Sequence, residues 1–418
     1  MGTPEALSPA FSISAINSRK MISLDEARTV IAQKIQPLPA ERSSLVRALG
    51  RVLREDAIAP EDIPAFDRSA MDGYAVGIDD SSPRFRVAGE IQPGASAPFK
   101  IGPGECARIF TGAATPEGAS QVIMQEDTER EGDGMIPRTR DRTTHIRHRG
   151  EDAREGSVLL RAGTRLRPPE LALLAQLGET QPRVSPAVRA LHFTTGNELV
   201  DPATQPGPGQ IRDTNSTLIG ALLADRGAEL ARQGYCEDSL EALVSEIETS
   251  AAQTWDLLLI SGGASVGDYD FGARALEQLG FQIHFRKINL RPGKPLIFAT
   301  RERQAAFVIP GNPVSHFVTF HTAIARAVEC FEDAPESWPI ATVKLASGIT
   351  DDPCPRETWS PARVSLKSGV LSAEPLVWQS SGDLCGLASA NGLIRIPARS
   401  QSFPAEADVS CLLLDQRW

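Results

Sequence analysis

The stretch DLLLISGGASVGDYDFGARALEQLG, residues 256–280, decides the fold class of this chain. It begins with an unbroken apolar run, continues through a glycine-rich loop, and ends in FGARALEQLG, whose apolar residues recur at helical spacing. A buried strand, a loop and a helix in this order form the repeating unit of a parallel α/β sheet. Because ligands bind beyond the carboxyl ends of such strands, the loop is a candidate ligand site.

The same alternation of strands and helices continues on both sides of this stretch, over residues 186–335. Further strands are expected at VRALHF, residues 188–193, and at AAFVI, residues 305–309. Nearly unbroken apolar strands predict a parallel sheet that is covered on both faces. The helices expected around it span residues 213–227, 238–251, 271–280 and 312–329.

Other textures flank this α/β domain. Residues 21–57 and 150–185 are expected to form one helical domain, since Ser23 and Glu26 have capping-box spacing and a second helix is expected to end at Gly178. Short β-like runs between Pro/Gly turns predict an inserted β domain over residues 58–149 and an all-β domain over residues 336–418. The expected fold class is multidomain α/β plus β.

Composition limits what the protein can do. A chain of 418 residues is too long for one core, so about two to four domains are expected. A formal net charge of -10 argues against nucleic-acid and anionic-membrane binding, which need a basic footprint. Six scattered cysteines without a CxxC pair favour a reducing compartment. With neither a signal-peptide pattern nor a long apolar span, a cytoplasmic protein is expected.

The glycine-rich loop resembles a phosphate cradle that contains acid. It lacks both the GK[ST] ending of a P-loop and the GxGxxG spacing, so nucleoside triphosphatases and dinucleotide-binding proteins are disfavoured. Gly262 and Gly263 allow close backbone approach to an anion. Asp268 and Asp270 have two interpretations: one of them caps the following helix, or one shares Mg²⁺ with a phosphate oxygen.

Two further strand ends and a basic segment carry polar groups. TTGNEL contains Glu198, and PGNPVS contains Asn312 and Ser315 at the start of a helix. The segment HFRKINLRPGKPLIF is either an anion-binding patch or a solvated loop of ordinary charges. Its basic residues are Arg286, Lys287, Arg291 and Lys294.

The expected β insert carries a second acidic region. DIPAFDRSAMDGYAV contains three aspartates, the last of them Asp72, and TGAATPEGA begins with Thr111. Asp-Gly is ordinarily a turn signal, so a structural role for each aspartate stays open. RGED, with Asp152 and neighbouring arginines, is either a self-paired surface or a second anion contact. Neither HExxH nor GxSxG occurs, which disfavours zinc proteases and serine hydrolases.

In combination, these segments resemble the molybdopterin molybdenumtransferase family, which includes bacterial MoeA and the E domain of gephyrin. The resemblance runs from about residue 21 to residue 400, with the motifs in the family's order. The segments that carry it are FDRSAMDGYAV, TGAATPEGASQVIMQED, RGED, AGTRL, TTGNEL, GQIRDTN, SGGASVGDYD, RPGKP and PGNPVS.

The resemblance implies an L-shaped homodimer with four domains per chain, the last of them barrel-like. The active site is expected between the α/β domain of one subunit and the β insert of the other. The implied reaction takes adenylylated molybdopterin and molybdate, releases AMP with the help of Mg²⁺, and gives molybdenum cofactor. A molybdopterin adenylyltransferase and molybdoenzyme chaperones are the protein partners that the resemblance suggests.

By position in the motifs, the resemblance also implies site residues. The catalytic group comprises Asp72, Thr111, Asp152, Glu198 and Asp270. The Mg²⁺ ligands would be Glu198, Glu237 and Asp270. The substrate-binding group comprises Gly262, Gly263, Ser265, Lys287, Arg291, Lys294, Pro310, Asn312, Pro313, Ser315, Arg356 and Ser381.

The chain departs from the family pattern at several of these motifs. Glu237 and Asn197 replace aspartates, and Arg291 stands where lysine is common. The C-terminal arginine motif leaves Arg356 and Arg363 as rival equivalents, and WQSSG replaces a more glycine-rich version. A divergent, non-catalytic scaffold and a tungstate-using insertase are therefore the alternatives to a molybdenum insertase.

Overall fold

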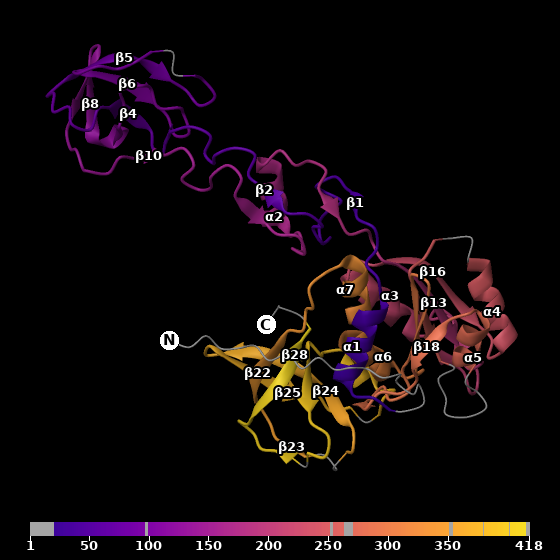
Figure 1. The fold of residues 1–418 in the computed structure, drawn as a ribbon. Coiled ribbons are helices and arrows are strands. Elements are labelled where there is room, and N and C mark those ends of the chain that lie inside the picture. The colour runs from indigo at the N-terminus through magenta and orange to yellow at the C-terminus, as the bar shows by residue number, and fades with distance from the viewer. Residues whose placement is uncertain are drawn as a thin grey trace, which may run out of the picture. The chain divides into compact units, whose positions relative to one another are not determined.

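The computed structural model describes residues 21–96, 99–250, 254–262, 271–350, 354–378, 380–400 and 402–414. The chain forms two compact units, which are drawn as ribbons in Figure 1. The first unit contains the described residues up to Ser43, residues Arg47–Arg54 and the chain from Arg183 onward. The second contains Ser44–Val46 and Glu55–Pro182.

A six-stranded sheet forms the centre of the first unit. Its order is β16 (Glu229–Cys236), β13 (Arg189–Thr195), β17 (Leu257–Ser261), β21 (Gln304–Ile309), β20 (Ile297–Arg301) and β18 (Gln282–Phe285). The strands from β16 to β21 are parallel, which confirms the predicted α/β fold. The pairs β21–β20 and β20–β18 are antiparallel. A tight turn at Glu302, with φ of 51°, reverses the chain between β20 and β21.

Helices cover both faces of this sheet, as the alternating burial of β17 requires. Leu257 and Leu259 share a core with α1 (Leu24–Lys34), α3 (Asn215–Asp225), α6 (Pro313–Thr319) and α7 (Ala325–Glu332). A π-helical turn, η3 (Phe320–Ile324), joins α6 to α7. On the other face, Leu258 and Ile260 pack with α4 (Leu240–Thr249) and α5 (Phe271–Gln278). Both faces are therefore dry, as expected for a parallel sheet.

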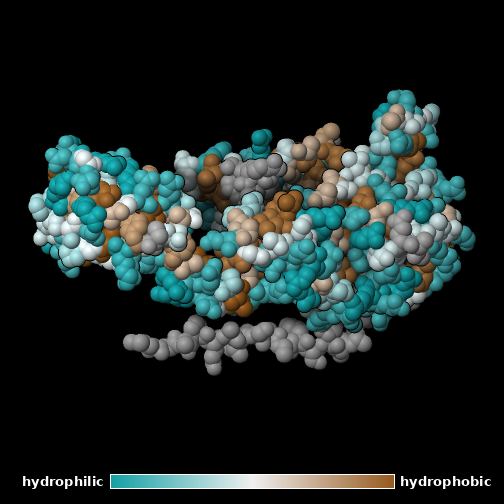
Figure 2. Space-filling model, turned by 90° about the horizontal axis from the view of Figure 1, so that it is seen from above, coloured by the Kyte–Doolittle hydropathy of each residue, from teal (hydrophilic) through white to brown (hydrophobic). Residues whose placement is uncertain are grey.

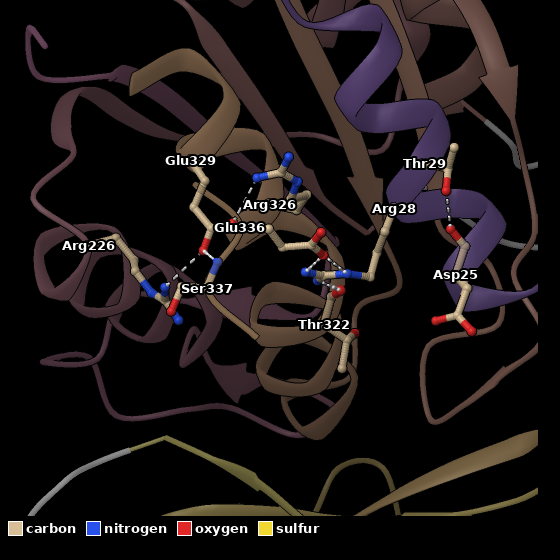
Figure 3. A network of polar contacts seen from close by, with 9 residues as sticks. All are labelled: Asp25, Arg28, Thr29, Arg226, Thr322, Arg326, Glu329, Glu336 and Ser337. Carbon is tan, nitrogen blue, oxygen red and sulfur yellow. Dashed lines mark hydrogen bonds and ion pairs between the residues drawn. The ribbon is translucent and has the colours of Figure 1, made fainter. Parts of the chain in front are cut away.

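Helix α1 begins as predicted and is anchored by a buried arginine. The Ser23 hydroxyl accepts from Glu26 N, and the Glu26 carboxylate accepts from Ser23 N, which completes the capping box. Figure 3 shows Arg28 of α1 directed at Thr322 and Glu336. Arg28 Nη1 donates to Thr322 O at 2.6 Å and Nη2 to Glu336 Oε1 at 2.5 Å, while the Trp338 ring lies 3.8 Å from the guanidinium carbon. These contacts fasten α1 to the η3 turn and to the segment after α7.

Arg28→Ala is expected to lower the free energy of unfolding of the first unit by about 2–3 kcal/mol. Arg28 is only 6% exposed, so its loss leaves the Thr322 carbonyl without its donor and removes the contact with Trp338. Urea denaturation monitored by tryptophan fluorescence measures this loss. The control is Lys344→Ala, which removes an exposed ion pair with Asp408 and should change stability by less than about 1 kcal/mol. Equal losses in the two variants would contradict the anchoring role.

The C-terminal part of the first unit is a closed five-stranded barrel. Strands pair around a ring in the order β22 (Ile340–Leu345), β25 (Val370–Pro375), β24 (Glu357–Lys367), β26 (Gly392–Ile396) and β28 (Asp408–Leu413), and β28 pairs again with β22. The barrel-like domain is therefore confirmed. A short strand, β19 (Leu290–Arg291), leaves the α/β part and pairs with the start of β24, so Arg291 lies opposite Thr358.

The second unit is built on another six-stranded sheet. Its order is β7 (Gln121–Met124), β4 (Gly73–Val76), β6 (Glu105–Ile109), β5 (Phe85–Ile91), β9 (Gly134–Pro137) and β8 (Thr128–Glu131).

Short elements in the described parts of both units complete the fold. They are β1 (Glu41–Arg42), β2 (Ala57–Ile58), β3 (Arg68–Ser69), η1 (Gln125–Asp127), β10 (Ile146–Arg147), β11 (Val158–Leu160), β12 (Arg183–Val184), β14 (Leu199–Val200), β15 (Ile211–Arg212), β23 (Ile349–Thr350), α8 (Leu384–Leu387) and β27 (Ser402–Phe403).

The two helical segments expected to share a domain lie in different units. Helix α1 packs in the first unit, whereas α2 (Pro168–Gln176) belongs to the second. Residues 45–50 form turns instead of the expected helical continuation, because Val46 and Leu49 stay exposed and have no core to face. The sequence-based boundaries at residues 58–149 and 336–418 stay predictions.

The surface is mainly hydrophilic on the face drawn in Figure 2, where hydrophobic residues form separate patches. Val377 is among the most exposed large hydrophobic side chains, at 85%. Among the described helices, none combines the length and apolar character that a membrane span needs.

Candidate functional site

A cavity of about 690 Å³ opens in the first unit where loops of the α/β part meet the barrel. Its lining includes seven residues expected at a substrate site: Arg291, Lys294, Pro310, Asn312, Ser315, Arg356 and Ser381. Polar residues of the barrel, including Ser347, Thr358 and Ser360, complete it. Among the described residues, the lining carries three cationic side chains and one carboxylate, Glu374. This balance favours an anionic ligand, although the whole chain is acidic.

The RPGKP turn brings two of these cations to the cavity. Gly293 has φ of 107°, and a Cβ there would lie 2.4 Å from Thr319 Cγ2, so only glycine fits. Arg291 precedes this turn on β19, and Lys294 follows it with an exposed side chain. Arg356 Nη1 donates to Leu290 O at 3.2 Å, which places the third cation beside the same turn.

A hydrogen bond joins the PGNPVS loop to a distant segment of the chain. Asn312 Nδ2 donates to Ser381 Oγ at 2.7 Å, and Val314 N donates to Ser381 O at 3.0 Å. Ser381 therefore belongs with the loop that follows β21, despite its distance along the chain. Three described residues of the predicted substrate-binding group, Gly262, Lys287 and Pro313, lie outside the lining. The Lys287 carbonyl instead accepts from Ile22 N at 3.2 Å.

The carboxyl ends of β13, β17 and β21 converge on a second polar area. Gly262 N donates to Ile309 O at 3.0 Å, and Asn215 Nδ2 donates to Gly311 O at 2.7 Å. Thr195 Oγ1 and Asn215 Oδ1 are buried without a hydrogen-bond partner in the described part of the chain. Such atoms are rare in folded proteins unless a ligand or water satisfies them. Sequence reasoning missed both residues, although they lie within the quoted motifs TTGNEL and GQIRDTN.

Acidic residues follow two adjacent strands at this same edge. Thr195 of β13 pairs with Cys236 of β16, so Glu198 and Glu237 come shortly after neighbouring strand ends. The pKa of the nearby Tyr235 is raised, first by burial and then by the negative charges of Asp238, Glu237 and Glu198. Both glutamates are exposed and belong to oxygen-donor types that hard cations prefer.

Asp270, Gly263 and Ser265 lie outside the described residues. Within the described ranges, no three His, Cys, Asp or Glu side chains are grouped closely enough to hold a metal ion.

Asn197, at a position where the resemblance leads us to expect aspartate, is matched to its surroundings. Asn197 N donates to Asp238 Oδ2 and Asp238 N donates to Asn197 Oδ1, both at 3.3 Å. An aspartate at position 197 would instead place two carboxylates against each other, which is unfavourable. The amide therefore suits the acidic residue that this chain has at position 238.

In the second unit, Asp72 and Thr111 lie together as a hydrogen-bonded pair. Asp72 Oδ1 accepts from Thr111 N at 2.8 Å and from Thr111 Oγ1 at 2.7 Å. The backbone hydrogen bond is the largest cause of the lowered pKa of Asp72, so this carboxylate stays ionised. Asp152 pairs with Arg147.

The other two aspartates of that region hold the RGED loop. Asp62 accepts from Arg149 Nε at 2.8 Å and from Glu155 N at 3.0 Å, and Asp67 accepts from Arg149 N at 2.7 Å. These hydrogen bonds are the reason that the pKa of each aspartate is lowered. Both residues therefore have the structural role that Asp-rich turns often have.

Comparison with known proteins agrees with this arrangement. Residues 22–178 match the MoeA N-terminal region (domain I and II), residues 192–329 a probable molybdopterin binding domain, and residues 342–414 the MoeA C-terminal region (domain IV). A molybdopterin molybdenumtransferase from Nostoc sp. is 33% identical in an alignment of 411 positions, which covers 94% of this chain and 94% of the relative. The chain belongs to the MoeA family.

Other relatives and solved structures agree with the membership in the MoeA family. A molybdopterin molybdenumtransferase from Haemophilus influenzae is 35% identical, covering 79% of this chain and 84% of the relative. The crystal structure of a molybdopterin biosynthesis MoeA protein from Pyrococcus horikoshii has a TM-score of 0.79 at 28% identity, covering 94% of this chain and all of that one.

The cavity is formed by two of the regions that match the MoeA family models. Asn312 and Ser315 lie in the part that matches the molybdopterin binding domain, and Arg356 lies in the part that matches domain IV. Arg363, the rival of Arg356 in the sequence, is exposed on β24 and is absent from the lining. The geometry therefore favours Arg356 as the C-terminal arginine of the site.

Four buried histidines are expected to make the first unit of this MoeA family member sensitive to acid. Burial lowers the pKa of His192 and His321 to about 3, and of His284 and His316 to about 4, from 6.5. Between 6.5 and these values the unfolded chain binds more protons than the folded chain, so stability falls as pH falls. Each histidine contributes up to about 1.4 kcal/mol per pH unit.

Urea denaturation should therefore give a lower free energy of unfolding at about pH 5 than at about pH 7. The steepest part of the decline is expected below pH 6.5, where the unfolded histidines become charged. A free energy of unfolding that stays constant over this range would contradict the neutral state of the four side chains.

Proposed function

We propose that this chain is a molybdenum insertase, which transfers molybdenum from molybdate into adenylylated molybdopterin with release of AMP. The cavity lined by Arg291, Lys294 and Arg356 is the observation that carries the proposal. The membership in the MoeA family supports it, because relatives that match most of this chain are named molybdopterin molybdenumtransferase.

The cavity has the chemistry that a tetrahedral oxyanion needs. Lys294 supplies a point charge, while the guanidinium groups of Arg291 and Arg356 supply fixed forks of N–H donors. Ser315 and Ser381 add hydroxyl groups that can donate to further oxygens. We assign molybdate to this cavity as the substrate that these donors would hold.

The strand-end area suits the nucleotide side of the substrate. Gly262 lets the backbone approach a pyrophosphate. Thr195 Oγ1 and Asn215 Oδ1 have no partner within the described residues, so the hydroxyl could donate to a bound group and the amide oxygen could accept from one. Glu198 and Glu237, together with Asp270, would hold Mg²⁺ at this edge. The cation would neutralise phosphate charge that these carboxylates would otherwise repel.

The proposal also includes a homodimer. The resemblance implies that Asp72, Thr111 and Asp152 take part in the reaction of a second copy. The ionised Asp72 with its Thr111 partner supports a polar, charged role for this pair.

The test is to incubate the purified chain with adenylylated molybdopterin, molybdate and Mg²⁺, and to measure AMP and active cofactor. We expect both products, and we expect a chelator to suppress AMP release. Glu198→Gln, which keeps the size of the side chain and removes its charge, should slow AMP release. The absence of both products in the intact chain would contradict the proposal, and competition with tungstate in the same assay decides which oxyanion is preferred.

A non-catalytic scaffold predicts instead that Glu198→Ala and Asp270→Ala leave biological activity unchanged. That alternative rests on Glu237, Arg291 and Asn197, at which the chain departs from the pattern of the family that it resembles. Arg291 keeps its charge in the cavity lining, and Asn197 is matched to Asp238 by hydrogen bonds. These two observations favour the insertase.

A further inference from the structure

A chain of buried hydrogen bonds connects the central sheet with Asn312 of the cavity lining. Ser261 Oγ, at the end of β17, lies 2.7 Å from His192 Nε2 of β13 and 2.7 Å from His316 Nε2 of α6. All three side chains are fully buried. The chain extends to Gln233 of β16, 2.9 Å from His192 Nδ1, and to Asn312 O, 3.0 Å from His316 Nδ1.

The two ends of this chain dictate where each proton lies. The Gln233 amide nitrogen also donates to Ser216 O at 2.9 Å, so this nitrogen, rather than the amide oxygen, faces His192. His192 Nδ1 must then accept, and its proton lies on Nε2. At the other end, Asn312 O can only accept, so the proton of His316 lies on Nδ1.

Ser261 connects these two tautomers in a single direction. Its oxygen accepts from His192 Nε2–H, and its hydroxyl donates to His316 Nε2. Every donor in this series of hydrogen bonds has an acceptor. The opposite tautomer of His192 would break the hydrogen bonds to Gln233 and Ser261, and the opposite tautomer of His316 would break the one to Asn312 O. Protonation of His192 would likewise place its Nδ1–H against the Gln233 amide nitrogen, which is also a donor.

This series of hydrogen bonds ends at Asn312, whose side chain joins the PGNPVS loop to Ser381. Asn312 O accepts from both His316 N, at 3.1 Å, and His316 Nδ1. With its peptide held twice, the Asn312 side chain is directed to Ser381 Oγ. Ser261, which immediately precedes Gly262, lies in the middle of this series of hydrogen bonds.

We propose that His192, Ser261 and His316 are positioning residues, which hold the Asn312–Ser381 pair and the start of the glycine-rich loop in the geometry that the substrate needs. The resemblance to the family assigns no role to these three residues. The proposed effect on catalysis rests on the proposed function, whereas the effect on Asn312 does not.

The first measurement determines the tautomers by NMR on the chain labelled with ¹⁵N-histidine, using single His→Gln variants for assignment. We expect a protonated Nε2 in His192 and a protonated Nδ1 in His316 at neutral pH. The opposite tautomer in either residue would overturn the proposal. This readout does not depend on any enzymatic activity.

The second measurement compares Ser261→Ala with a matched control, His284→Gln. His284 is also buried, and its substitution alters a comparable hydrogen bond, to Thr300 Oγ1 at 2.8 Å, away from the cavity lining. In Ser261→Ala we expect hydrogen exchange of the Asn312 side-chain amide to rise at least about tenfold, with no change in His284→Gln. Equal exchange in the two variants would overturn the positioning role.

AMP release then separates positioning from general stability. Ser261→Ala should lower kcat about tenfold or more, whereas His284→Gln should keep the rate of the unaltered chain at temperatures where both remain folded. His192→Gln, which keeps a donor near the position of Nε2, should retain more activity than His192→Phe. If the unaltered chain releases no AMP, the proposed function fails, while the tautomer and exchange measurements still decide the positioning role.

Discussion

Lys294→Ala is expected to reduce AMP release about 100-fold or more. Among the described cationic residues of the cavity lining, Lys294 is the one whose charge is a compact ammonium group. The turn at Gly293 fixes the position of its backbone. Without Lys294, a bound oxyanion would lose one of the positive charges that stabilise it and would keep those of Arg291 and Arg356. The measurement is kcat/KM for molybdate in the AMP-release assay.

Two further variants make this result specific. Lys294→Arg keeps the charge but replaces a point charge with a fork, so an intermediate loss is expected. Lys344→Ala removes a lysine of β22 that lies outside the lining and pairs with Asp408, and it should keep the activity of the unaltered chain. If Lys294→Ala and Lys344→Ala had the same kcat/KM, the cavity could not be the oxyanion site.

Gly262→Ala is expected to have the second large effect. Gly262 has φ of 95°, and a Cβ there would lie 2.7 Å from both Thr195 O and Thr195 Oγ1. The substitution therefore forces the ends of β13 and β17 apart in addition to straining the backbone. Because displacements of about 1 Å can lower rates 100-fold, we expect a loss of that order in kcat.

Gly227→Ala is the matched control for that substitution. Gly227 also has positive φ, 72°, but nothing lies within 4 Å of the Cβ that alanine would add. Both variants should lose about 1 kcal/mol or more of stability through backbone strain. Only Gly262→Ala should lose activity while it remains folded, and equal kcat values in the two folded variants would contradict the role of the strand end.

The local patterns of the sequence predicted the α/β sheet and the basic segment that brings Arg291 and Lys294 to the cavity. Pro310, Arg356 and Ser381 were expected at a substrate site only through the resemblance to the family. Apolar runs such as DLLLI identify buried strands, and Gly and Pro in RPGKP identify a turn. Strands β18 and β20 were not predicted. Their antiparallel direction could not be predicted either, because the apolar residues of a strand do not show which way it runs in a sheet. Strand β16 was missed because ELARQGYC is largely polar and only partly buried.

The remaining part of the site depends on contacts between distant segments. Nothing in the local sequence shows that Ser381 reaches Asn312 or that Arg356, rather than Arg363, enters the cavity. His192 and His316 also looked unremarkable as separate residues, because neither has metal-ligand spacing. Their significance arises only where the sheet and α6 place both rings against Ser261.

The most direct test of the account is a crystal of this chain soaked with molybdate and AMP, recorded at the molybdenum absorption edge. The anomalous signal locates molybdenum without reference to activity. We predict a single strong site within hydrogen-bonding distance of Lys294, Arg356 and Ser315. Molybdenum bound elsewhere in the first unit, with this cavity lacking any anomalous peak, would contradict the central claim.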